Sequence, residues 1–258
     1  MSLTQLALGA LLMAISLGFS LALRLKLGRQ ILVASLRMTV QLLLVGLILS
    51  WLFSLSSLWA VIGVGFIMTT LAAHAAAGRP ARTYPQIFLD SFLSVFGSAF
   101  LLTGIALAGI IQPEPWYQPQ YSIPILGMVL GNALTGVSLA IDRYTHALAT
   151  ERDLIENLLT LGATRWEATH AHFRDAMRAG MIPTLNSMTV MGIVSLPGMM
   201  TGQILGGTDP TTAVRYQILI MFIIAASTTI ASVWILSLTF LRMFDNWHRL
   251  RLERLVER

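Results

Sequence analysis

The chain has 258 residues, of which 55% are hydrophobic and 11% are charged, and its formal net charge is +5 at pH 7. Water-soluble domains carry about 25% charged residues, and a chain of this length has too little interior to bury so much apolar surface. These values exclude a soluble enzyme or binding domain and predict an all-α polytopic membrane protein.

Missing residue types exclude two kinds of site, those built on cysteine and the P-loop type of ATP site. The chain has no cysteine, so disulfides and thiolate metal sites are absent. Its single lysine, Lys26, follows Leu25, so there is no GxxxxGK[ST] phosphate-binding loop and no ATP site of that type. The basic residues fall in short loops between apolar runs, which is typical of membrane topology and not of nucleic-acid binding.

Apolar runs long enough to span a bilayer recur along the chain. The first has no basic residue before it and is followed by Arg24, Lys26 and Arg29, which indicates an uncleaved anchor with its N-terminus outside. We predict about seven transmembrane helices within a single domain over 1–258, at 3–23, 34–53, 58–77, 90–111, 123–141, 184–205 and 217–241.

The basic residues also indicate sidedness. With these seven spans, every Lys and Arg except Arg215 falls on one side, which is the cytoplasmic side by the positive-inside rule. The C-terminus is then cytoplasmic. The proline-rich loop near 112–122 lies outside, where Trp116, Tyr117 and Tyr121 are expected at the headgroup level as an aromatic belt.

The cytoplasmic segment 142–183 differs from the rest because it has the pattern of a soluble helical hairpin. Leu154, Ile155, Leu158 and Leu161 share one helical face, with charged residues elsewhere. Gly162 is placed to end that helix in a left-handed conformation, and Thr164 with Glu167 forms a capping box that starts a second helix. The leucine-rich face either docks into a partner protein or folds back on the membrane surface or the other inner loops, and the sequence leaves both open.

Polar residues inside apolar runs are candidates for a substrate pathway. Arg37 and Gln41, four residues apart, share a face near the inner end of the second span. His74, Asp90 and Asn132 are further candidates, with Asp90 as a cation-attracting group. In the alternative interpretation, Arg37 and Asp90 are interfacial residues that pair with each other or extend toward the headgroups.

The sixth predicted span contains a helix breaker. Pro197 has no N–H to donate to the carbonyl of Ile193, so a kink is expected there, with Gly198 adding freedom; the two form a candidate hinge. Met199 and Gln203 follow on the outer half and could contact substrate. Thioether coordination would suit Cu(I) better than iron, and methionine also fills gaps, so no metal ligand is assigned.

Two short patterns have mainly structural interpretations. Gly127, Gly131 and Thr135 recur every four residues in the fifth span, which favours a close helix contact within or between subunits. Glu167 and His170 have the Glu-x-x-His spacing of di-iron bundles, but such sites need two copies plus further glutamates, and one copy is present. No catalytic residue is predicted.

The segment "ENLLTLGATRWEA…MIPTLNS" resembles the coupling segment of ABC-transporter permeases, which has a Glu, a Gly a few residues later and a downstream Pro. Here these are Glu156, Gly162 and Pro183, while Asn157 and Leu158 replace the two alanines that follow the Glu in the pattern. The stretches "LRMTVQLLLVG", "GNALTGVSLAIDR" and "SLPGMMTGQILGG" are similar to the FetB-type permeases, the membrane half of an iron exporter, and the likeness covers nearly the whole chain.

This resemblance implies the permease subunit of an ABC exporter in the bacterial inner membrane, which moves iron or another metal cation outward. It implies a permease homodimer with separate ATPase subunits, which bind ATP and Mg²⁺, while this chain binds no cofactor. The residues implied in coupling to the ATPase are Glu156, Leu158, Leu161, Gly162, Ala163, Thr164 and Glu167. The alternatives are a stand-alone secondary transporter or channel, a membrane enzyme, and a receptor-like scaffold.

Overall fold

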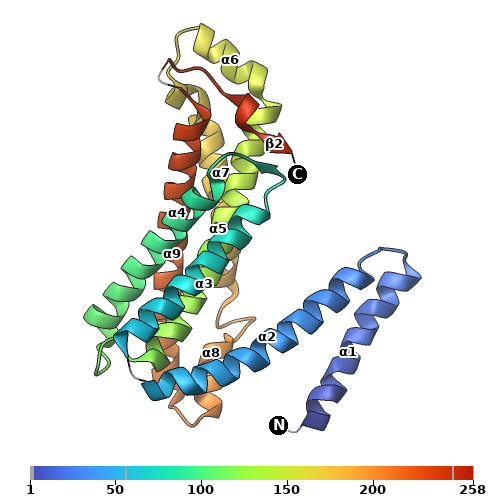
Figure 1. Ribbon diagram of the computed structural model, residues 1–258, viewed down its shortest axis with the longest axis vertical. Helices are drawn as coiled ribbons and strands as arrows, with labels where there is room; N and C mark the ends of the chain where they lie inside the picture. The colour runs from blue at the N-terminus through green and yellow to red at the C-terminus, as the bar shows by residue number, and fades with distance from the viewer. Residues whose placement is uncertain (1–2, 56, 246, 258) are drawn as a thin grey trace. The chain divides into compact units, whose positions relative to one another are not determined.

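The structure is a computed structural model that describes residues 3–55, 57–245 and 247–257 (Figure 1). The described residues are almost entirely helical. The α-helices are α1 (Leu3–Ala22), α2 (Gly28–Leu55), α3 (Leu58–Gly78), α4 (Ile87–Ile105), α5 (Pro119–Thr150), α6 (Arg152–Thr160), α7 (Arg165–Val190), α8 (Gly198–Leu205) and α9 (Pro210–Met243). The π-helix η1 (Ala106–Ile111) continues α4, and the C-terminal tail adds the 3₁₀-helix η2 (Leu252–Arg254); β1 (Arg82–Thr83) and β2 (Val256–Glu257) are two-residue strands.

The prediction of a helical membrane protein is confirmed. Five helical segments of the described residues are long and apolar enough to cross a membrane: Gly28–Leu55, Leu58–Gly78, Ile87–Ile111, Pro119–Thr150 and Pro210–Met243. The first predicted span corresponds to α1, whose described apolar part, Leu8–Ala22, is shorter. The count of seven is therefore not confirmed.

The sixth predicted span, 184–205, is wrong as a continuous helix. α7 ends at Val190, and α8 begins only at Gly198. In between, Gly192 has φ +83°, a left-handed conformation that only glycine adopts easily, and its N–H donates to the carbonyl of Ser195 at 2.9 Å. Pro197 caps α8 in an extended conformation, because it lacks the N–H needed to continue a helix. The expected kink at Pro197 is instead a seven-residue break, 191–197.

The chain divides into two compact units, Met1–Ser56 and Ser57–Arg258, which are described separately. In the first unit, Ser20 organises the turn between α1 and α2. Its carbonyl accepts the N–H of Leu25 at 3.0 Å and its Oγ accepts the N–H of Leu27 at 3.1 Å. In the turn that these bonds form, Arg24 and Lys26 both have positive φ angles.

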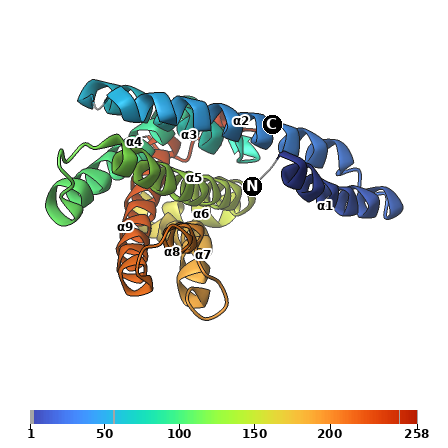
Figure 2. The same ribbon diagram turned by 90° about the horizontal axis from the view of Figure 1, so that it is seen from below.

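In the second unit, α5 is the central helix. Viewed along the bundle, it lies between α3 and α4 on one side and α7 and α9 on the other (Figure 2). α5 and α7 come closest at Gly136 and Gly180: a methyl group at Gly180 would lie 2.8 Å from the carbonyl oxygen of Gly136, and one at Gly136 would lie 2.5 Å from Thr228 Cγ2 of α9. The predicted contact residue Gly131 instead faces open space within this chain.

Alanine substitutions at these two glycines of α5 should therefore have opposite effects. We expect Gly136→Ala to destabilise the protein by about 1–3 kcal/mol, because Thr228 and the backbone of α7 would have to move. Gly131→Ala, the matched control, should leave the stability of the monomeric protein unchanged or raise it by up to about 1 kcal/mol, since the chain itself places nothing near a methyl group there and alanine has the higher helix propensity. Thermal unfolding in detergent measures both, and equal melting temperatures for the two variants would contradict the packing described.

The C-terminal tail is fixed to the loop between α3 and α4. β1 and β2 pair antiparallel, with Arg82 opposite Glu257, and the guanidinium of Arg82 lies 2.8 Å from the Glu257 carboxylate. β2 and α6 lie at one end of the second unit, and α8 lies at the opposite end (Figure 1). The α6–α7 hairpin and the C-terminal tail therefore lie at the same end of the second unit.

Candidate functional site

The turn between α6 and α7 is built as the sequence indicates. Gly162 has φ +94° and is the left-handed residue that ends α6. The N–H of Ala163 donates to the carbonyl of Leu158 at 3.0 Å, and the N–H of Gly162 donates to that of Leu159 at 3.1 Å. This pair of bonds is a Schellman motif, which satisfies carbonyls that the helix end would otherwise leave free.

The capping box at the start of α7 is also present. The N–H of Glu167 donates to Thr164 Oγ1 at 3.3 Å, and Glu167 Oε2 accepts the N–H of Thr164 at 2.8 Å. This backbone hydrogen bond lowers the pKa of the Glu167 carboxyl below its ordinary value, so the box is fully formed at neutral pH and weakens as the pH falls through that lowered pKa. The Glu167 carboxylate is therefore ionised at neutral pH, in the form that accepts both hydrogen bonds of the box.

The leucine-rich face of α6 divides between the interior and the surface. Ile155 is completely buried, and Leu158 is half-buried against the protein's own core. Leu154 is exposed, and Leu161, at the tip, is 84% exposed. The base of this face therefore folds back on the protein itself. Its tip makes no contact with the core and is left open to a partner.

A turn of the C-terminal tail, residues 244–245 and 247–250, lies against the start of α7. The N–H of Arg165 donates to His248 Nδ1 at 3.2 Å, and the Arg165 guanidinium donates to the carbonyl of Asp245 at 3.3 Å. The Asp245 carboxylate accepts the N–H groups of Trp247 and Arg249, each at 2.9 Å, and the bond from Arg249 is the largest cause of the lowered pKa of Asp245. The sequence carried no local signal for the contact of this turn with α7, because the hydrogen bonds that form it join residues 83 and 80 positions apart.

Asp90 lies in a buried ion pair at the start of α4. Its two carboxylate oxygens accept hydrogen bonds from Arg242 of α9 at 3.2 and 3.4 Å. Nearby, the Tyr84 hydroxyl lies 3.0 Å from Thr239 Oγ1, and burial raises the pKa of this phenol. Within the second unit, the partner of Asp90 is therefore Arg242, a pairing that the sequence did not predict.

Two of the other predicted pathway residues of the second unit, His74 and Asn132, have local partners. His74 is exposed and packs edge-on against Phe88, with ring centroids 6.4 Å apart. Asn132 Nδ2 donates to the carbonyl of Met128 at 2.9 Å in its own helix. Met199 and Gln203 are half-buried in α8, and Gln203 Oε1 has no hydrogen-bond partner among the residues described.

In the first unit, Arg37 and Gln41 share a face of α2, as predicted, and line one groove together with Lys26 and Arg29. In the second unit, Pro197 and Gly198 lie where the break 191–197 meets α8, which places the candidate hinge at an interruption of the helix.

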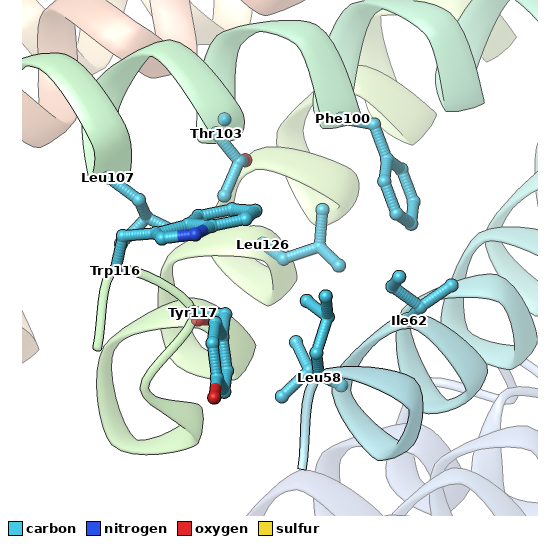
Figure 3. A pocket seen from close by; sticks show the side chains of 11 residues that line it. Leu58, Ile62, Phe100, Thr103, Leu107, Trp116, Tyr117 and Leu126 are labelled. Atoms are coloured by element: carbon cyan, nitrogen blue, oxygen red, sulfur yellow. The ribbon is translucent and has the colours of Figure 1, made fainter. Parts of the chain in front are cut away.

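The predicted aromatic belt forms part of an apolar cavity of about 260 Å³. Trp116 and Tyr117 pack edge to face, with centroids 5.8 Å apart. Figure 3 shows these rings and Phe100 around the cavity, with Leu58 and Leu126 between them. Almost all of its lining is apolar, which suits a lipid-facing surface better than a polar substrate.

A metal centre at Glu167 and His170 is not supported. Among the residues described, no group of three or more His, Asp or Glu side chains is arranged to hold a metal ion. The Glu167 carboxylate is engaged in the capping box, and the His170 ring packs on Trp166 at 5.0 Å.

Comparison with known proteins extends over almost the whole chain. Residues 3–244 match the family described as "Uncharacterised protein family (UPF0014)". A UPF0014 membrane protein of Synechocystis is 44% identical over 87% of this chain and 86% of its own. The "Probable iron export permease protein FetB" of Escherichia coli is 31% identical over 98% of this chain and 96% of its own. The UPF0014 membrane protein YjkA of Bacillus subtilis is 33% identical over 96% of this chain and 97% of its own. No solved structure shows a significant match.

Proposed function

Because the chain belongs to the UPF0014 family of membrane proteins, we propose that it is the permease subunit of an ABC exporter that moves iron or another metal cation out of the cytoplasm. One observation carries the proposal: the α6–α7 turn is a rigid, doubly capped hairpin whose apolar tip, Leu161, is exposed. A hairpin of this kind suits docking into a cleft of a separate ATPase subunit, which would bind the ATP and Mg²⁺.

α7 offers a physical route from this hairpin into the membrane. It is a continuous helix of 26 residues, roughly 39 Å long, from the capping box to the break 191–197. A helix packed along α5 transmits a push with little deformation, whereas the break contains few helical hydrogen bonds to resist it. Closure of the ATPase subunits would therefore move α8 about a hinge at Pro197 and Gly198.

The same proposal includes a homodimer. Gly131 lies on an exposed part of α5 where the chain itself places nothing within 4 Å of a methyl group. Small residues let two transmembrane helices approach closely, so this face suits a second copy of the chain. Two copies would enclose the pathway between them.

We also propose that the end carrying α6 and the C-terminus is cytoplasmic, in the bacterial inner membrane. Since the chain has no cysteine, a single introduced thiol reports its own accessibility. A membrane-impermeant maleimide applied to intact spheroplasts should label the Glu114→Cys variant, and should label Leu161→Cys only after permeabilisation. The reverse pattern would contradict the proposed sidedness.

The transport function itself is tested with the full complex. The protein is reconstituted in liposomes with a candidate ABC ATPase subunit from the same organism, and ATP hydrolysis is measured with and without Fe²⁺ inside and outside the vesicles. We expect iron on the nucleotide-binding side to stimulate hydrolysis several-fold, and iron to be moved only with ATP. Iron movement that needs no ATP would favour a secondary transporter or channel instead.

A further inference from the structure

A basic groove runs along one face of α2 in the first unit. Its volume is about 700 Å³. The lining residues recur with helical spacing, so that they form one continuous stripe from the α1–α2 turn toward the middle of the helix. They are Lys26, Arg29, Gln30, Val33, Ala34, Arg37, Met38 and Gln41.

The positive charge of the groove has no internal counterpart. The first acidic residue of the chain is Asp90, so residues 1–89 contain no carboxylate side chain. Asp90 is engaged by Arg242 through both of its oxygens. In the part of the chain that the structure describes, Lys26, Arg29 and Arg37 take part in no ion pair. Within the first unit, these three cations therefore have no carboxylate partner, and an anion from outside the unit can pair with them.

The expected direction of the side chains concentrates the positive charge at the end of the groove nearest the N-terminus of α2. Helical side chains lean toward the N-terminus of their helix. In α2 this direction points from Arg37 back toward Arg29, which is roughly 12 Å away along the axis. The long side chain of Arg37 is therefore expected to reach toward Arg29, and a ligand that bridges the cations would lie between Arg37 and the turn that carries Lys26.

The floor of the groove is apolar. Val33, Ala34 and Met38 lie between the cationic residues, and Val33 and Met38 are exposed. A ligand that fits must therefore combine a negatively charged head with a hydrocarbon part. A phospholipid with a net negative headgroup has this combination, whereas a soluble anion would leave the apolar floor uncovered.

We propose that this groove is a binding site for an anionic phospholipid, with the phosphate held by Lys26, Arg29 and Arg37 and an acyl chain along Val33 and Met38. Gln30 and Gln41 would add hydrogen bonds along the groove. The site lies on the first unit, so its occupancy does not depend on the ATPase contact proposed at Leu161, and the two proposals can fail separately.

The test measures lipid binding to the full-length protein in a neutral detergent by native mass spectrometry. Phosphatidylglycerol should be retained at least fivefold more tightly than phosphatidylcholine by the wild type. Arg37→Gln and Arg29→Gln should each weaken phosphatidylglycerol binding about fivefold, the usual contribution of one cation near an anionic headgroup. Arg37→Lys should keep most of the affinity, because it keeps the charge.

Arg24→Gln is the matched control. Arg24 is exposed in the same turn but does not line the groove, so this variant should change binding less than twofold. Circular dichroism and gel filtration of each variant verify that it is folded; Arg29, in the first turn of α2, supplies a second probe where Arg37→Gln fails to fold. Equal losses for Arg24→Gln and Arg29→Gln, or equal binding of the two lipids, would overturn the proposal.

A second experiment distinguishes binding of a lipid from binding of a soluble phosphate. The protein is placed in phosphatidylcholine nanodiscs and titrated with pyrophosphate. We expect no binding that depends on Arg29 or Arg37. Tight pyrophosphate binding that Arg37→Gln removes, without a preference for phosphatidylglycerol, would assign the groove to a soluble anion and overturn the lipid assignment.

Discussion

If the protein has the proposed function, Leu161→Glu is expected to abolish the contact with an ATPase subunit while leaving the protein folded. Leu161 is 84% exposed and makes no contact with the core, so its replacement removes nothing from the interior. In a complex, the same side chain would be buried, and a carboxylate there loses about 2 kcal/mol of apolar burial and adds a desolvation cost of similar size. Together these correspond to a loss of affinity of about 100-fold or more.

The affinity of the purified permease for its cognate ATPase, and the stimulation of ATP hydrolysis by the permease, measure this effect. Thr160→Glu is the matched control, because Thr160 is exposed and lies one residue away in the same turn. This variant should retain most of the affinity and most of the stimulation of ATP hydrolysis. Leu158 is a poorer position for this test, because it is half-buried and an acidic residue there would also destabilise the hairpin. If Leu161→Glu binds and responds like the wild type, the hairpin is not the coupling element.

The second large effect is expected at the buried ion pair. Asp90→Asn should lower the stability of the protein by about 2 kcal/mol, because it leaves the Arg242 guanidinium without its charge partner at the end of α9. The effect should be smaller than for a fully buried pair, since Arg242 is 38% exposed and water compensates part of the loss. Thermal unfolding in detergent measures the change.

Two comparisons separate a structural role of Asp90 from a role in transport. The double variant Asp90→Asn/Arg242→Gln should recover part of the stability lost in the single variant, as coupled residues do in a double-mutant cycle. Glu253→Gln, on an exposed residue of the tail, should leave the melting temperature unchanged. A folded Asp90→Asn protein with wild-type stability but no transport would show instead that this carboxylate acts on the cargo.

The details of the hairpin were predictable because each depends on neighbouring residues. The left-handed conformation of Gly162 and the reciprocal bonds of Thr164 and Glu167 join residues at most a few positions apart. Local spacing contains this information, so the ends of α6 and the start of α7 agree with the prediction. The apolar runs are equally local, and they determine the membrane class.

The break 191–197 shows the limit of such reasoning. Pro197 indicated that the helix is disturbed, but one proline is compatible with a kink or with a complete interruption. The positive φ of Gly192 and the bond from its N–H to Ser195 decide between them.

Taken alone, the sequence determined the chemical class of this protein: a cysteine-free, helical membrane protein with a capped hairpin and with basic residues in the loops between its apolar runs. Only the tertiary structure decided which distant residues meet. Arg242 pairs with Asp90 across 152 positions, Arg165 with the tail turn, and Gly136, not Gly131, with the neighbouring helix within the chain. The physical reason is that caps, turns and apolar runs are stabilised by neighbours in the chain, whereas a buried ion pair or a helix contact depends on the three-dimensional path of the backbone between its members.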